Sequence, residues 1–322
     1  MNTKSLSLII ILCVVSGIID IACAQQQSFY INYNGQLLSS ADSADYIRII
    51  KAPDDASNLF NIFEFYPDGQ KKLIGKSAKV DPYNLDGPCV SYYRNGFRKR
   101  VVNYSSGLMV GEEYLYFPNG VLYTVKSYSK PKVDIYTRIP IQDVKIISCN
   151  DSLNTSLVVE GKGHYRGYDP EFKYICEEGD VLNGNKIAEW HGEDRAYGLK
   201  FTENYTANGK IENATSVTAD GKTYAYKQRE VSPQFAGGVD SFNDYVRRNL
   251  VAGTIVRGAV FVTFTVEKDG NPSGIVLKDK ANEFIIEAIK VVKNSPKWMP
   301  ATHFGVPVAR RLTIPVFFNQ VY

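Results

Sequence analysis

One stretch near the C-terminal end decides the fold of this part of the chain: Gly258-Ala259-Val260-Phe261-Val262-Thr263-Phe264-Thr265-Val266. Valine or phenylalanine stands at every second position from Val260 to Val266. This alternation predicts a strand in a sheet that is covered on at least one face. Asp269-Gly270 follows and is typical of a tight hairpin turn. The turn leads into a second predicted strand at Gly274–Leu277, so the two strands form an antiparallel hairpin.

Two amphipathic segments flank this hairpin. Val239–Leu250 and Ile285–Val292 both carry their apolar residues at the spacing of one helical face. Alternation then returns at Leu312–Phe318, which predicts a third strand. The sequence therefore predicts an α+β domain over residues 230–322, with two helices packed on a three-stranded antiparallel sheet.

The same part of the chain, from Val231 to about Phe318, resembles the TonB C-terminal domain. The motifs that carry the resemblance are Phe235-Ala236-Gly237-Gly238, Gly258-x-Val260, Phe264-x-Val266-x-x-Asp269-Gly270, Pro296-Lys297-Trp298-x-Pro300 and Leu312-x-Ile314-Pro315-Val316-x-Phe318. The Phe-x-Gly-Gly entry is common in versions of the domain from the Bacteroidetes. The chain departs from the family at Leu250–Ile255, which is shorter than usual and lacks a Tyr-Pro pair.

The resemblance implies a non-enzymatic periplasmic domain whose partner is a protein, either an outer-membrane receptor or another envelope protein. Such domains lend a sheet edge to an extended peptide, an interaction called β-augmentation. The expected partner-binding edge consists of Val308, Ala309, Arg310, Arg311, Leu312, Thr313 and Ile314. Pro315 fits a free docking edge, and it fits equally an edge that is blocked against aggregation. A homodimer through the same edge is a further expectation.

The residues before this domain predict a series of β-hairpins. Aromatic strands run into Asp-Gly or Asn-Gly turns and then into return strands at Phe63–Gly75, Tyr92–Tyr104 and Tyr114–Tyr128. The turn glycines at positions 69, 96 and 120 are 27 and 24 residues apart. This periodicity indicates a repeat architecture. Residues 25–229 are therefore expected to form a mainly β sheet of stacked hairpins, interrupted around residues 129–154.

The three best-matched hairpins resemble the MORN-like repeats of the YwqK-type antitoxin family. They share the order of an aromatic pair, an Asn-Gly or Asp-Gly turn and a return strand. The motif is short and degenerate, so the resemblance implies a structural or interaction ladder rather than a specific activity. No antitoxin function is expected from it.

The first 24 residues predict an export signal rather than a part of the fold. Lys4 precedes an apolar run at Leu6–Val15, and Ala22-Cys23-Ala24 fits a cleavage site before Gln25. Two alternatives stay open: a lipoprotein cleaved before Cys23, and an uncleaved membrane anchor, which needs about 20 apolar residues. Cleavage would place the protein in the periplasm. An anchor would hold it on the inner membrane, facing the periplasm.

No cofactor or metal ion is expected. Without the signal, three cysteines remain, Cys89, Cys149 and Cys176. Their spacing matches no zinc pattern, and an odd number allows at most one disulfide, whose pair the sequence does not select. The three histidines, His164, His191 and His303, lie in separate regions of the chain.

Composition and motifs restrict the classes of function. A formal net charge of +3 without a basic tract argues against nucleic acid as a partner. No Gly-x-Ser-x-Gly motif is present, so no catalytic residue is expected. Two competing hypotheses remain. One is a TonB energy transducer anchored by residues 6–24, although the 14 scattered prolines form no extended spacer. The other is a glycan-active or hydrolytic enzyme on the aromatic repeat face.

Overall fold

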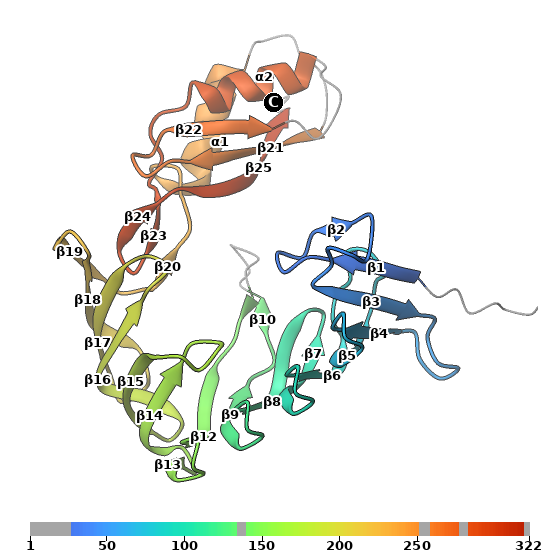
Figure 1. The fold of residues 1–322 in the computed structure, drawn as a ribbon. Helices are drawn as coiled ribbons and strands as arrows, with labels where there is room; N and C mark the ends of the chain where they lie inside the picture. The colour runs from blue at the N-terminus through green and yellow to red at the C-terminus, as the bar shows by residue number, and fades with distance from the viewer. Residues whose placement is uncertain (1–26, 134–139, 251–257, 277–282, 319–322) are drawn as a thin grey trace, which may run out of the picture. The chain divides into compact units, whose positions relative to one another are not determined.

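The computed structural model describes residues 27–133, 140–250, 258–276 and 283–318. The chain divides into two compact units, of which the first ends at Met109 and the second begins at Val110. Strands dominate both units, and the helices lie in the C-terminal part (Figure 1). This confirms the predicted fold class, a mainly β region followed by an α+β domain. The predicted export signal at residues 1–24 lies outside the described residues.

The first unit is an antiparallel ladder of hairpins. Its strands are β1 (Gln27–Ile31), β2 (Leu37–Leu38), β3 (Tyr46–Lys51), β4 (Phe60–Phe65), β5 (Lys71–Ser77), β6 (Gly87–Tyr92) and β7 (Arg98–Ser105). From β3 to β7 each strand pairs with the next, and β1 pairs with both β2 and β3. The predicted turns lie where expected: Gly69 and Gly96 have φ angles of 82° and 88°, which hairpin turns of this kind require.

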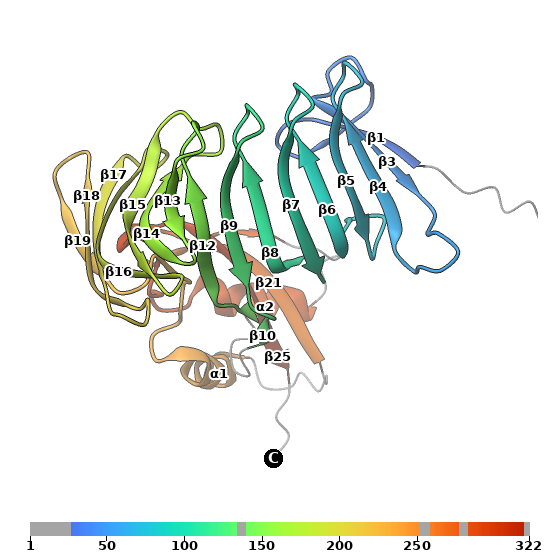
Figure 2. The same cartoon turned by 90° about the horizontal axis from the view of Figure 1, so that it is seen from below.

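The second unit contains a longer antiparallel ladder. Its first strand begins two residues before the boundary between the units. The strands are β8 (Leu108–Tyr116), β9 (Leu122–Tyr128), β12 (Val144–Asn150), β13 (Ser156–Val159), β14 (Lys162–Tyr168), β15 (Ile175–Leu182), β16 (Asn185–Asp194), β17 (Leu199–Tyr205), β18 (Ile211–Thr218) and β19 (Thr223–Tyr226). Each strand pairs with the next strand in this order. Figure 2 shows the strands from β12 to β19 following one another in chain order.

Within the interruption predicted at residues 129–154, the structure contains a strand of the ladder, β12. A short excursion through β10 (Lys132–Val133) and β11 (Pro140–Ile141) separates β9 from β12, which pairs directly with β9. The register of that pairing shifts between Ile146 and Ser148. Because a shift of one residue breaks the alternation of apolar side chains, the sequence pattern hides this strand.

Residues 230–318 form the part of the second unit that we call the C-terminal module. Its elements are β20 (Glu230–Val231), α1 (Gly238–Asn249), β21 (Gly258–Val266), β22 (Pro272–Val276), α2 (Glu283–Lys293), β23 (Ala301–His303), β24 (Val306–Val308) and β25 (Arg310–Phe318). β21 lies between β22 and β25 in one sheet, and β23 lies between β20 and β24 in another. The sequence did not predict the second sheet, because its strands are only two or three residues long.

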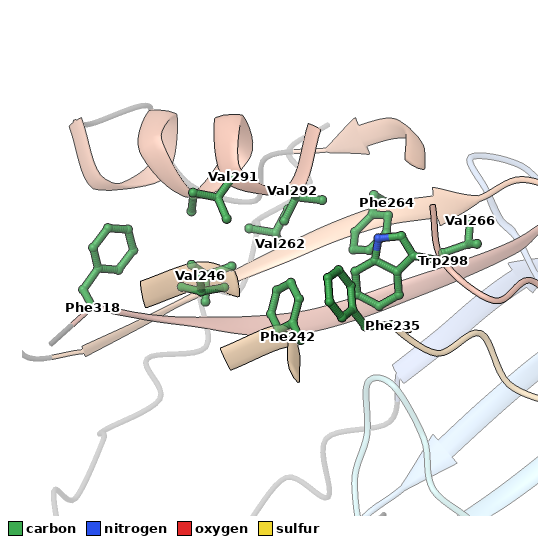
Figure 3. Close-up of a cluster of buried hydrophobic side chains, with 12 residues drawn as sticks. Phe235, Phe242, Val246, Val262, Phe264, Val266, Val291, Val292, Trp298 and Phe318 are labelled. Atoms are coloured by element: carbon green, nitrogen blue, oxygen red, sulfur yellow. The ribbon is translucent and has the colours of Figure 1, made fainter. Parts of the chain in front are cut away.

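One tryptophan organises the core of the C-terminal module. Trp298 is 5% exposed, and its ring centroid lies 5.2 Å from those of Phe235 and Phe264 (Figure 3). Trp298 therefore fills the core of the module. The same buried cluster contains side chains of both helices and of two strands: Phe242, Val246, Val262, Val266, Ala288, Val291, Val292, Val316 and Phe318. Both helices therefore cover the same face of the β21 sheet, as predicted.

The three cysteines in the described residues are free thiols. Cys89 and Cys149 are buried, and burial raises the pKa of each thiol to about 11. Both are therefore protonated near neutral pH, a state in which a thiol is a poor nucleophile.

Candidate protein-docking edge

β25 is an edge strand of the C-terminal module. It pairs with β21 along its whole length, from Gly258↔Phe318 to Val266↔Arg310. β22 occupies the far side of β21, so β25 has a neighbour on one side only within the described part of the chain. Nine residues of backbone thus border an open edge, which is the geometry that strand addition needs.

The residues predicted to form the docking edge divide between two strands. Val308 ends β24, is 7% exposed and pairs with Ala301. Ala309 is an exposed link, and Arg310–Ile314 form the first part of β25. Val308 therefore belongs to the second small sheet, whereas the open edge continues past Ile314 to Phe318.

Pro315 indicates which backbone groups of β25 face outward. In an antiparallel pair, residues alternate between those that bond to the neighbouring strand and those whose N–H and C=O point away from it. A proline fits the second kind of position because it has no N–H to donate. Thr313 and Phe317 stand two residues on either side of Pro315, and Arg311 has the same parity. We infer that the outward donors of the edge are Arg311, Thr313 and Phe317.

Two aromatic side chains lie on the face of the sheet opposite the helices. Phe261 is 64% exposed and Phe317 is 54% exposed. Phe261 is opposite Pro315 in the register, so Phe317 is its diagonal neighbour and the two rings are within reach of each other. The sequence prediction of the site did not include them. The alternation of the sequence could have identified them. Both stand at odd positions, whereas the buried apolar residues of their strands stand at even positions.

A histidine links the C-terminal module to the ladder of the second unit. His303 in β23 is 9% exposed, with Nε2 2.8 Å from Asp194 Oδ2 and Nδ1 in contact with Glu230 Oε1. The His303 ring therefore bridges a carboxylate of the ladder and a carboxylate of the C-terminal module. Arg310, the first residue of β25, donates to Glu230 Oε2 at 2.6 Å. Polar contacts thus run from the ladder to the start of the open edge.

The turn between β23 and β24 inserts into the end of the ladder. The Phe304 ring centroid lies 4.6 Å from that of Phe201 and 5.6 Å from that of Tyr226. Ser216 Oγ donates to the Phe304 carbonyl oxygen at 2.7 Å. Gly305 has a φ angle of 80°, and a Cβ at this position would lie 3.1 Å from a ladder carbonyl oxygen. The turn therefore closes the aromatic end of the ladder.

Arg229 holds a buried charge network beside this turn. Its Nε donates to Glu203 Oε1 and its Nη2 donates to Glu177 Oε2, both at 2.7 Å. Burial alone would raise the pKa of Glu177, but the Lys186 ammonium and the Arg229 guanidinium outweigh burial and hold that pKa at about 2. Burial lowers the pKa of Lys186 to about 8. The network therefore stays charged at neutral pH. It lies at the start of the chain segment that connects the ladder to the C-terminal module.

The described ranges contain neither a membrane-spanning helix nor a metal centre. None of their helices combines the length and apolar composition needed to cross a bilayer. None of their His, Cys, Asp and Glu side chains form a group of three or more that could hold a metal ion.

A family model described as the Gram-negative bacterial TonB protein C-terminal matches residues 255–320. The match spans β21, β22, α2, β23, β24 and β25, and so includes the open edge. No curated protein matches the chain. The matched residues are thus similar to a domain that interacts with outer-membrane receptors. Such domains occur in envelope transport proteins and act in interaction rather than as enzymes. Both ladders lie outside the matched residues.

Proposed function

We propose that this chain is an exported, non-enzymatic TonB-like protein of the periplasm. It docks an envelope or outer-membrane transport protein by β-augmentation at β25. One observation carries the proposal: β25 is paired on one side only in the described part of the chain and lies inside the residues similar to TonB. The ladders act as a spacer and as a further interaction surface.

The open edge offers both affinity and selectivity. An added strand would form main-chain hydrogen bonds with the outward groups of Arg311, Thr313 and Phe317, and each such bond contributes about 0.5–1.5 kcal/mol. The exposed rings of Phe261 and Phe317 would cover an apolar side chain of the partner. Arg311 is exposed further along the same face of β25 and favours a partner segment that carries a carboxylate.

The link to the ladder gives this edge a fixed support. His303 and Arg310 both contact Glu230, and Arg310 begins β25. A partner bound along β25 would therefore be held against a strand whose first residue is already positioned. Such preorganisation reduces the loss of conformational entropy on binding.

The test compares two substitutions of one residue in the whole chain. Thr313→Pro removes an outward N–H, whereas Thr313→Ala removes the same side chain and keeps the N–H. Tagged chains would capture partners from a solubilised Gram-negative envelope, and captured proteins would be identified by mass spectrometry. We expect the Ala variant to recover an outer-membrane transport protein that the Pro variant does not. Equal recovery by the two folded variants would rule out docking at this edge.

A second candidate function is a membrane-anchored TonB energy transducer for outer-membrane transport. The observation in its favour is the apolar run Leu6–Val15 at the start of a chain with a TonB-like C-terminal part. N-terminal sequencing of the mature protein separates the two. A chain that starts at Gln25 excludes the anchored transducer, and a chain that retains residues 6–24 supports it.

A further inference from the structure

The first unit carries an apolar stripe on one face of its ladder. The stripe follows one cross-strand row, in which each residue is registered opposite the next: Ile49, Phe63, Ile74, Val90 and Val101. These side chains are half-buried, and the opposite face of the same strands carries the fully buried Ile62 and Glu64. The row crosses five strands, a span of roughly 20 Å at about 4.8 Å per strand.

A pocket opens at the β3–β5 end of this stripe. Its volume is about 330 Å³, and it is lined by Ile49, Lys51, Phe63, Phe65, Lys71 and Ile74. The size is at the lower end of the range for small-molecule sites, which are mainly apolar with a few polar groups. The lining has that composition, since four of its side chains are apolar and the other two are lysines.

The two lysines of the pocket differ from their neighbours on the same strands. Lys72 and Lys76 form ion pairs with Glu64 and Asp54. Lys51 and Lys71 have no carboxylate partner among the described residues, and the Lys51 ammonium lies 5.5 Å from the Phe63 ring centroid. The pocket therefore combines an apolar floor with two cations whose charge is not neutralised by a neighbouring acid.

The shape of this surface restricts its occupant. The strands β3, β4 and β5 are paired on both sides, so a peptide strand cannot add to them. At β3 and β4 the stripe is flanked by apolar Ile47 and Phe65 on one side and by polar Lys51 and Asn61 on the other. A helix, which is about 10 Å wide with its side chains, would rest on these polar neighbours. A single apolar chain matches the stripe better.

We propose that the first unit binds a free single-chain anionic amphiphile, a fatty carboxylate. Its carboxylate lies between Lys51 and Lys71, and its tail runs over Ile74 toward Val90 and Val101. This site is separate from β25, and the proposal does not depend on docking at that edge.

Calorimetric titration of the purified whole chain with dodecanoate, below its micellar concentration, tests the proposal. We expect saturable binding with one site per chain. Because two ion pairs are lost, the double variant Lys51→Glu, Lys71→Glu should bind about tenfold more weakly. The matched control is Lys162→Glu, Lys200→Glu, which makes the same charge change at exposed positions of the second unit and should leave the affinity unchanged.

Three further measurements keep the outcome decisive. Circular dichroism establishes that each variant is folded, and Lys51→Gln, Lys71→Gln replaces the Glu variant if that one is not. Dodecyltrimethylammonium has the same tail and the opposite charge, and should show no saturable binding. Sedimentation with anionic phospholipid vesicles separates a free amphiphile from a membrane surface. Absence of saturable dodecanoate binding, equal binding by the double variant, or binding to vesicles alone would overturn the proposal.

Discussion

Glu64 in the first unit and Glu203 in the second are both buried, and each is paired with an arginine. Glu64 in β4 is 1% exposed and accepts hydrogen bonds from Arg48 and Lys72, which stand on the neighbouring strands β3 and β5. Glu203 in β17 is 0% exposed and is neutralised by Arg229, which lies between the last ladder strand and the C-terminal module. The charge of Glu64 is thus balanced within its ladder, and that of Glu203 is balanced by the connection to the module.

This difference shows how a repeated hairpin acquires a specific attachment. A buried carboxylate is costly unless it is paired, so each glutamate requires its cation. At Glu64 the requirement fixes the pairing of three adjacent strands. At Glu203 it fixes the chain segment that leads to β25. Loss of the cation should therefore disturb the ladder in the first unit and the docking module in the second.

The largest effect is expected from Arg229→Ala. It leaves Glu203 and Glu177 without their shared guanidinium, and breaking a buried pair in this way costs about 3–5 kcal/mol. Urea unfolding followed by tryptophan fluorescence measures the loss directly, because the chain has two tryptophans and both, Trp190 and Trp298, lie in the second unit. Arg229→Lys is the control and should recover part of the stability. An unchanged unfolding midpoint in the Ala variant would contradict the comparison.

Arg48→Ala should have a smaller effect, confined to the first unit. Lys72 remains beside Glu64, so we expect a loss of about 1–3 kcal/mol. Hydrogen exchange of peptides from β3, β4 and β5 is the suitable measurement, since this unit contains no tryptophan. Faster exchange in those peptides, with the tryptophan transition unchanged, is the predicted result. A shift of that transition would mean that the Glu64 pair also stabilises the second unit, which would contradict the comparison.

His303→Ala should loosen the attachment with a loss of about 1–2 kcal/mol, because it removes hydrogen bonds to two carboxylates. Glu230 would keep Arg310 as a partner, which limits the effect. Faster hydrogen exchange in β20, β23 and β24, with the β12–β14 peptides unaffected, is the expected pattern. His303→Gln keeps one hydrogen-bond donor, so its exchange rates should lie between those of the unsubstituted chain and the Ala variant. Uniform exchange changes throughout the second unit would not fit this account.

Acid should lower the stability of the second unit because it protonates Glu177. Near neutral pH this effect is the smallest of the four. Its pKa is about 2 in the folded chain and 4.5 in the reference state. The stability it contributes is therefore fully present above about pH 4.5 and is lost as the pH falls toward 2. Glu177→Gln should flatten the dependence of the tryptophan transition on pH in this window. If the tryptophan transition depended equally on pH in the unsubstituted chain and in the Gln variant, Glu177 would not be the group responsible.

Much of this fold follows from local patterns. Hairpins such as β4–β5 are encoded by alternating aromatics and an Asp-Gly turn, and Val260–Val266 encodes β21 by alternation alone. The exceptions are elements whose structure depends on distant residues. The pairing of β12 is hidden by a register shift, and β23 and β24 are too short to produce a periodic signal.

The candidate site was predictable only in part. The alternation at Leu312–Phe318 predicted the last strand. The sequence could not place Val308 in a different strand, because β24 ends there through pairing with Ala301. The role of Arg229 could not be predicted either, because its two carboxylate partners lie 26 and 52 residues away along the chain. Long-range charge pairs have no sequence spacing of their own, so only the structure brings them together.

Hydrogen exchange of the β25 amides, measured with and without the captured transport protein, tests the docking of a partner strand most directly. In the free chain, the outward amides of Arg311, Thr313 and Phe317 should exchange fast, while those bonded to β21 exchange slowly. Binding should slow these three amides and leave the inward amides of β25 unchanged. Protection that appears elsewhere in the module while the three outward amides stay fast would contradict docking at this edge.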